Sequence, residues 1–228
     1  HPFCPEESAR GRVKSVKFLS DKPILLSAGN DAKVTIWDVD TSSRTAKPLP
    51  FALEHDNAIW DLDVSPDGSL LATADFDGSV RVYQTGTWRL LNKIAADTFA
   101  SRSGSRRLQP GVSADDLNAL RTVRFNSAST MLVTSSLDRT ARVWTPLLGR
   151  ANIPELSYRL PPGDDKRPRR INSVALNPSR EEVAFTDRAA VYVKSAGKLP
   201  KALPSGRSDG ASHRLSRTST RCCSSHRT

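Results

Sequence analysis

The chain has few cysteines and no long apolar run. Its 228 residues include three cysteines, Cys4, Cys222 and Cys223, which are too few and too close to the chain ends for a disulfide framework or a paired zinc site. No segment approaches the roughly 18 consecutive apolar residues of a membrane-spanning helix. We therefore expect a protein of a reducing intracellular compartment, the cytoplasm or the nucleus, with no membrane partner.

The sequence also lacks the common motifs of nucleotide binding and catalysis. It contains no GxxxxGK[ST] loop, no GxGxxG turn, no HExxH motif and no CxxC pair, each of which supplies a specific chemistry where it occurs. The scattered carboxylates Asp61, Asp63 and Asp75 fall on expected strand faces and turns, where we expect them to be solvated. We therefore predict a protein that is not an enzyme and binds no metal ion and no cofactor.

What the sequence does contain is a repeated strand pattern. Residues 58–64 alternate between apolar and polar side chains, which is the period of a half-buried strand. Two turn sequences, Ser-Pro-Asp-Gly at 65–68 and Asp-Phe-Asp-Gly at 75–78, separate this strand from further strands at 70–74 and 79–83. Asp, Pro and Gly favour such tight connections. One meander of this kind cannot bury its own apolar face, so copies are expected.

Copies of the second hairpin occur at 24–38 and 131–144, with a weaker copy at 182–193. In the three clear copies a turn Asp stands six residues before an aromatic residue and four residues after a Ser or Thr. The three sets are Ser27, Asp31 and Trp37; Thr73, Asp77 and Tyr83; and Thr134, Asp138 and Trp144.

This pattern resembles the WD40 repeat family over about residues 13–194. The resemblance implies an all-β fold, a β-propeller of four-stranded antiparallel blades around a central channel. Three clear blades are expected at about 13–54, 55–96 and 121–160, followed by a degenerate blade at 171–194. Propellers have roughly 4–8 blades, and the chain begins with His. We therefore expect an incomplete propeller, from a fragment or an incomplete gene model.

The segments outside the blades are polar. Residues 1–12 form an N-terminal segment, and 97–120 form an insertion. Residues 195–228 hold seven Lys and Arg against one Asp and are expected to be a disordered Ser/Arg-rich tail. A basic cluster resembles a nuclear-localisation signal, with a solvated loop as the alternative, at Lys166, Arg167, Arg169 and Arg170.

The family resemblance also implies a structural network of hydrogen bonds. In WD40 repeats a His before the first strand, the Ser or Thr, the turn Asp and the aromatic residue form this network. In the second blade it carries over to His55, Thr73, Asp77 and Tyr83. In the first and third blades, which lack the His, it carries over to Ser27, Asp31, Trp37, Thr134, Asp138 and Trp144. This interpretation is favoured over a catalytic triad at His55.

The resemblance places a partner-binding rim at one end of the channel. The matching positions are Asn30, Asp56, Ala58, Phe76 and Leu137. Exposed side chains of Phe76 and Leu137 would form an apolar anchor; packing under neighbouring loops is the alternative. The leading hypothesis is a non-enzymatic scaffold for protein–protein interactions, because stacked blades offer a broad, rigid surface.

Two other functions stay open. A nucleic-acid-associated propeller, in RNA processing or chromatin, would use the basic loops and tail, although no aromatic residues interleave them for base stacking. A propeller fragment of a larger multidomain protein is the other, because a fold does not fix a function. The identity of the partner is not predicted.

Overall fold

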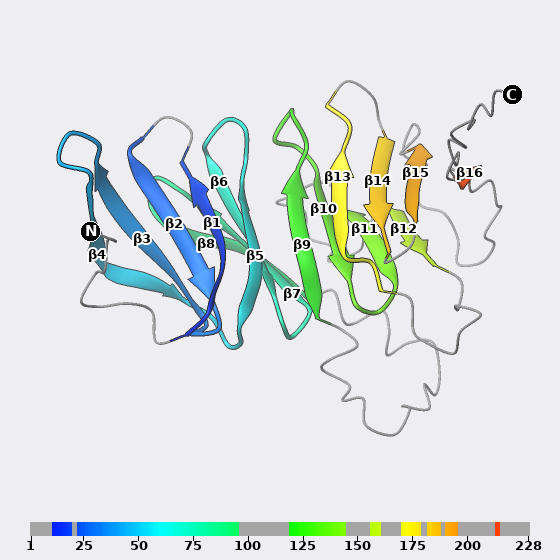
Figure 1. Ribbon diagram of the computed structural model, residues 1–228, viewed down its shortest axis with the longest axis horizontal. Coiled ribbons are helices and arrows are strands. Elements are labelled where there is room, and N and C mark those ends of the chain that lie inside the picture. Colours follow the sequence, from blue (N-terminus) through cyan, green and yellow to red (C-terminus); the bar gives the residue numbers. More distant parts are fainter. Residues whose placement is uncertain are drawn as a thin grey trace, which may run out of the picture.

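The computed structural model of the chain describes residues 11–19, 22–95, 119–144, 156–160, 170–178, 182–187 and 190–195, and the backbone of 213–214. These residues form β-strands and their connections, in four antiparallel four-stranded sheets (Figure 1). The predicted all-β fold is confirmed, and each sheet corresponds to one WD40-type blade. This part of the chain contains no helix of the length and apolar character needed to cross a membrane.

The first two blades follow one another with only a short loop between them. Blade 1 consists of β1 (Val13–Phe18), β2 (Ile24–Gly29), β3 (Lys33–Asp40) and β4 (Thr45–Glu54). Blade 2 consists of β5 (Ile59–Val64), β6 (Leu70–Asp75), β7 (Ser79–Gln84) and β8 (Arg89–Ala95).

The other two blades have shorter strands. Blade 3 consists of β9 (Leu120–Phe125), β10 (Leu132–Ser136), β11 (Thr140–Trp144) and β12 (Leu156–Arg159). Blade 4 consists of β13 (Ser173–Leu176), β14 (Glu182–Thr186), β15 (Val191–Ser195) and β16 (His213–Arg214).

The same turn joins the second and third strands of blades 1, 2 and 3. The residue after each turn Asp has a positive φ, 59° at Ala32, 85° at Gly78 and 76° at Arg139. Only glycine adopts this conformation without steric cost. The turn geometry is therefore kept in all three blades even where the sequence offers a residue that resists it.

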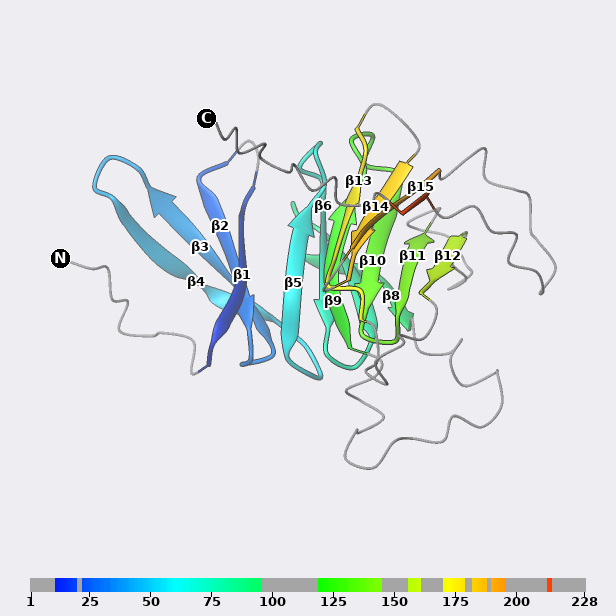
Figure 2. The ribbon, with the colours of Figure 1, turned by 45° about the vertical axis from the view of Figure 1, so that its right-hand side comes forward.

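The core lies between neighbouring blades. One cluster of buried residues joins Leu26 and Ile36 of blade 1 to Leu71 of blade 2. Equivalent clusters fill the spaces between blades 2 and 3 and between blades 3 and 4. The first strands of successive blades, β1, β5, β9 and β13, contact one another in chain order, and Figures 1 and 2 show the sheets side by side in that order.

The last strand comes from the segment expected to be a Ser/Arg-rich tail. His213 and Arg214 of β16 pair with Val193 and Tyr192 of β15, within the segment expected to be disordered. The outer edge of β15 presents backbone N–H and C=O groups that a short segment of almost any composition can satisfy. Most of segments 1–12 and 97–120, and the residues Lys166, Arg167 and Arg169, lie outside the described residues.

Candidate functional site

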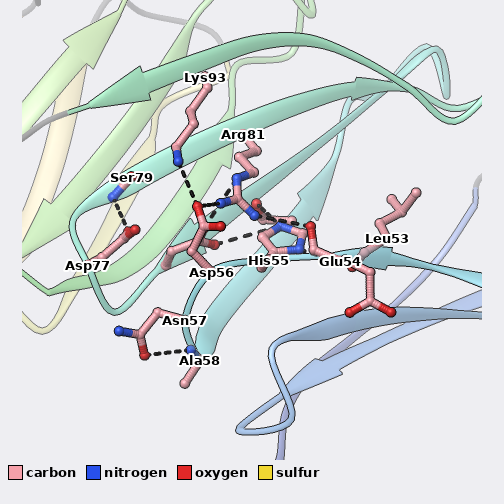
Figure 3. A network of polar contacts seen from close by, with 12 residues as sticks. Leu53, Glu54, His55, Asp56, Asn57, Ala58, Asp77, Ser79, Arg81 and Lys93 are labelled. Carbon is pink, nitrogen blue, oxygen red and sulfur yellow. Dashed lines mark hydrogen bonds and ion pairs between the residues drawn. The ribbon is translucent and has the colours of Figure 1, made fainter.

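His55 lies in the connection between β4 and β5, in the buried centre of blade 2 (Figure 3). Its Nδ1 is 3.0 Å from the carbonyl oxygen of Leu53; because a carbonyl only accepts, Nδ1 carries the proton. Its Nε2 is 3.0 Å from Thr73 Oγ1 and 3.5 Å from the Tyr83 hydroxyl, so a hydroxyl donates to it. Burial, followed by the Arg81 charge, lowers the pKa of His55 to about 4, which keeps the ring neutral.

Asp75, the last residue of β6, is the least satisfied group of this centre. Its side chain is fully buried, and neither carboxylate oxygen has a hydrogen-bond partner among the described residues. Oδ1 lies 3.8 Å from His55 Nε2, and Oδ2 lies 3.7 Å from Arg81 Nε. Burial raises the pKa of Asp75 to about 8, against the opposing effect of Arg81. The carboxyl group is therefore held mainly in its neutral form at pH 7.

Arg81 of β7 connects this buried centre to the surface. Its guanidinium donates to the backbone oxygen of Glu54 at 3.2 Å and forms an ion pair with Asp56. Lys93 Nζ also donates to Asp56, at 2.8 Å. The Asp56 side chain is largely exposed, and the Lys93 hydrogen bond, with the Arg81 charge, lowers its pKa. Asp56 is thus reachable at the rim but already holds two cations.

The structure differs from the expected network at Asp77. Asp77 Oδ1 accepts a hydrogen bond from the backbone N–H of Ser79 at 2.9 Å, which closes its own turn (Figure 3). The carboxylate next to His55 is that of Asp75 instead. The physical reason is the geometry of the hairpin: Asp75 ends a strand beside the ring, whereas Asp77 lies in the turn, where the backbone offers the nearer donor.

Blades 1 and 3 contain a smaller hydrogen-bond network at the equivalent position, made of two side chains. Trp37 Nε1 donates to Ser27 Oγ at 2.8 Å, and Trp144 Nε1 donates to Thr134 Oγ1 at 3.0 Å. Asp31 lies half-buried in the turn that follows β2. In these blades the indole N–H reaches the Ser or Thr directly and needs no histidine.

Asp138 of blade 3 accepts its hydrogen bonds from its own hairpin. Thr140 donates through its backbone N–H at 2.8 Å and through its hydroxyl. Arg142 donates to the other carboxylate oxygen at 2.6 Å, and both side chains are buried.

Two buried aspartates of β5 join three blades, which corrects their expected solvation. Asp61 accepts from Ser15 Oγ of β1 at 2.9 Å and from the backbone N–H of Val123 of β9 at 3.2 Å. Asp63 accepts from the backbone N–H of Phe125 at 2.9 Å. It also forms a 3.0 Å ion pair with Lys17, and Asp61 forms one with Arg124. These carboxylates satisfy the free edge of β9, whose other edge pairs with β10.

The predicted rim residues fall into two groups. Asn30 and Asp56 are exposed, and Ala58 is half-buried. Phe76 is half-buried and stacks on Trp60, with ring centroids 6.1 Å apart. Leu137 is only 6% exposed, and its backbone N–H donates to the Ala119 oxygen at 3.0 Å. Leu137 is therefore not an exposed anchor, and Phe76 is the apolar group within reach of a partner.

His55 and Thr73 are buried, so the group that looks like a triad in the sequence has no surface at which to meet a substrate. In the residues that the structure describes, no three or more His, Cys, Asp or Glu side chains gather in an arrangement that could hold a metal ion.

Comparison with known proteins matches the repeats seen in the fold. The model of the family described as "WD domain, G-beta repeat" matches residues 5–38, 47–84 and 113–145. These ranges cover most of the strands of blades 1, 2 and 3.

Several characterised proteins are similar to the chain over part of their length. A guanine nucleotide-binding protein subunit beta-like protein of Encephalitozoon cuniculi is 27% identical over 194 residues, 81% of this chain and 49% of that protein. The U5 small nuclear ribonucleoprotein 40 kDa protein of Dictyostelium discoideum is 26% identical over 63% of this chain and 46% of its own. Eukaryotic translation initiation factor 3 subunit I of Phaeosphaeria nodorum is 31% identical over 40% of this chain and 25% of its own. In each case the match spans less than half of the relative's length.

Proposed function

Because this chain belongs to the WD40 repeat family, we propose that it is a non-enzymatic scaffold that binds other proteins at one end of its blades. This end, called the turn end below, carries the β2–β3, β6–β7 and β10–β11 turns.

The half-buried stack of Phe76 on Trp60 is the observation that carries this proposal. A large apolar side chain that is fixed in place, yet partly exposed, loses little conformational entropy when a partner covers it. Phe76 is fixed by its contact with Trp60 and by the hydrogen bond from its N–H to the Ala58 oxygen at 2.8 Å. The exposed Asn30 of the β2–β3 turn and the exposed Asp56 of the β4–β5 connection supply polar groups at the same end of the blades.

Phe76→Asp should abolish partner binding without unfolding the protein. The matched control is Phe51→Asp, which places the same charge on an exposed aromatic position of β4, 45% exposed, on the outer strand of blade 1. Proteins captured by the wild-type chain and by each variant are compared by quantitative mass spectrometry, with the melting midpoint as the folding check. Partners kept by Phe76→Asp, or lost equally with Phe51→Asp, would contradict binding at the turn end.

A nucleic-acid-associated role is the second candidate, and the composition of the tail favours it. Seven Lys and Arg against one Asp in residues 195–228 would bind phosphates without sequence preference and with strong salt dependence. RNA binding that weakens steeply with salt and disappears on deletion of 195–228 would support this role. RNA binding that survives the deletion would contradict it.

We also propose that the protein works in the cytoplasm or the nucleus. The basic cluster Lys166, Arg167, Arg169 and Arg170 is the candidate import signal. Replacing the four residues with Ala in a fluorescently tagged chain should remove nuclear accumulation; an unchanged distribution would leave the cluster as a loop between blades.

A further inference from the structure

The first strands of blades 1, 2 and 3 share one irregularity near their starts. The pairing of β1 with β2 skips Lys14, and the pairing of β5 with β6 skips Trp60. The pairing of β9 with β10 skips Arg121 in the same way. A skipped residue of this kind is a β-bulge, which redirects its side chain out of the regular alternation of the strand. Three equivalent bulges therefore redirect three side chains at the turn end.

These three side chains meet. Lys14 Nζ lies 4.4 Å from the centroid of the Trp60 ring, and Arg121 Cζ lies 4.3 Å from it. Both distances fall well within the range of cation–π attraction. Phe76 stacks on the same ring. We call Lys14, Trp60 and Arg121 the bulge cluster; its members are half-buried, so they are held in place and still accessible.

The positive charge of the bulge cluster has no ion-pair partner among the residues that the structure describes. Further along the same strands, Lys17 pairs with Asp63 and Arg124 pairs with Asp61. Within the described ranges no carboxylate lies at ion-pair distance from Lys14 or Arg121. Burial, and then the charge of nearby Arg170, lower the pKa of Arg121. Two like charges thus lie close together without a compensating anion from the described residues, an arrangement that costs free energy unless an anion is supplied.

We propose that the bulge cluster is a binding site for an acidic segment of a partner protein. This inference rests on the proposed function and names the chemistry of the partner. A guanidinium offers a carboxylate two parallel hydrogen bonds, and an ammonium adds a point charge. The edges of Trp60 and Phe76 provide apolar contact for the side chains around the acid.

The geometry favours an acidic peptide over a nucleic acid. A single-stranded nucleic acid needs free aromatic faces for base stacking and a row of cations along several phosphates. Here two cations and the Phe76 ring already lie against Trp60, and the cations form one compact group.

Fluorescence anisotropy with synthetic peptides tests the proposal on the full 228-residue chain. The probe is a labelled peptide of Glu and Asp interspersed with Gly and Ser, and its control replaces every acid with its amide. The wild-type chain should bind the acidic peptide and not the amide peptide. The double variant Lys14→Gln/Arg121→Gln should weaken this binding by about tenfold or more, because it removes two charge-assisted contacts.

The matched control is Lys47→Gln/Arg89→Gln, which removes two exposed cations from the outer strands β4 and β8 and should leave binding unchanged. Equal binding of the acidic and amide peptides, equal loss in both double variants, or tighter binding of a single-stranded RNA at the same residues would overturn the proposal. If the first double variant melts early, the readout is tryptophan fluorescence: addition of acidic peptide should change it in the wild type and not in Trp60→Phe. A persisting change in Trp60→Phe would equally overturn the proposal.

The outcome is distinguishable from failure of the proposed function. Partner proteins lost from Phe76→Asp but kept by Lys14→Gln/Arg121→Gln would leave binding at the turn end intact and remove the acidic preference. If both variants keep the partner proteins and the wild-type chain does not bind the acidic peptide, both the proposed binding at the turn end and the acidic preference would be contradicted.

Discussion

Blades 2 and 3 bury the same kinds of residues at the same hairpin and satisfy them differently. In blade 3 the carboxylate of Asp138 receives donors from Thr140 and Arg142, all within four residues. In blade 2 the carboxylate of Asp75 is fully buried without a hydrogen bond among the described residues, and its nearest cation, Arg81, is 3.7 Å away.

The difference follows from where the partners of each aspartate come from. In blade 3 the guanidinium of Arg142 forms an ion pair with the buried carboxylate of Asp138. Arg81 divides its donors between Glu54, at the end of β4, and Asp56 of the connection that follows. The same connection carries His55. Blade 2 therefore joins its hairpin to the loop that leads in from blade 1, and the cost is one unsatisfied carboxyl group, which burial keeps protonated.

The largest expected loss of stability comes from changing Asp138, the carboxylate whose hydrogen bonds are satisfied. Asp138→Asn leaves the buried guanidinium of Arg142 without its counter-charge, and the free energy of unfolding should fall by about 3 kcal/mol. Urea denaturation measures it. Asp38→Asn, at an exposed position of β3, is the control and should leave the midpoint unchanged. A loss no larger than that of the control would mean that the Asp138 contacts contribute nothing to stability.

Removal of the histidine should have the next largest effect. His55→Ala leaves the buried Thr73 hydroxyl and the Leu53 oxygen without their partner, which should lower the free energy of unfolding by about 1–3 kcal/mol. Thr134→Val removes the hydrogen-bond acceptor of Trp144 in blade 3, and its loss of stability gives the contribution of the two-residue network for comparison. An unchanged melting midpoint for His55→Ala would remove the claim that the ring stabilises blade 2.

The smallest effect is expected at Asp75, and it depends on pH. The pKa of Asp75 is raised from 3.8 to about 8, so the stability of its neutral form is fully present below about pH 4 and is lost as the pH rises through 8. The pKa of His55 is lowered from 6.5 to about 4, so its contribution is present above pH 6.5 and changes only as the pH falls.

Between pH 7 and 9 only Asp75 should therefore titrate among these two groups. Asp75→Asn, which cannot ionise, should be more stable than the wild type at pH 9 by about 1 kcal/mol or more, since no buried charge forms. The two proteins should melt at nearly the same temperature at pH 4 and below, and the difference should grow as the pH rises toward 8. A stability difference that stays constant from pH 5 to pH 9 would show that Asp75 does not carry the expected shift.

The sequence predicted the hairpins well because their signals are local. Each aromatic residue stands ten positions after its Ser or Thr, and the antiparallel register brings the two together across β2 and β3 or across β10 and β11. The Trp37–Ser27 and Trp144–Thr134 hydrogen bonds follow from that register. The position of Asp75, rather than Asp77, beside His55 does not follow from that register. The two aspartates are two residues apart, and His55 comes from a different connection, so the hairpin alone does not say which aspartate faces the ring.

Contacts between blades were also beyond prediction from one sequence. Asp61 and Asp63 alternate with apolar residues and read as a solvated strand face. Their partners lie about 46 and 62 residues away, and no local period encodes that distance. The bulges at Lys14, Trp60 and Arg121 are likewise invisible to alternation, although two cations and one tryptophan at matching strand positions are a signal that a comparison of the repeats can detect.

The contacts that Asp61 and Asp63 make with both β1 and β9 affect how the chain unfolds. Repeat proteins usually come apart one interface at a time, with stabilities that add between nearest neighbours. Here the same two side chains serve both the interface of β5 with β1 and that of β5 with β9. Opening either interface removes some of the partners of both carboxylates and so weakens the other interface. The first three blades should consequently behave as one cooperative unit, and the removal of any of them should destabilise more than the interface that it visibly breaks.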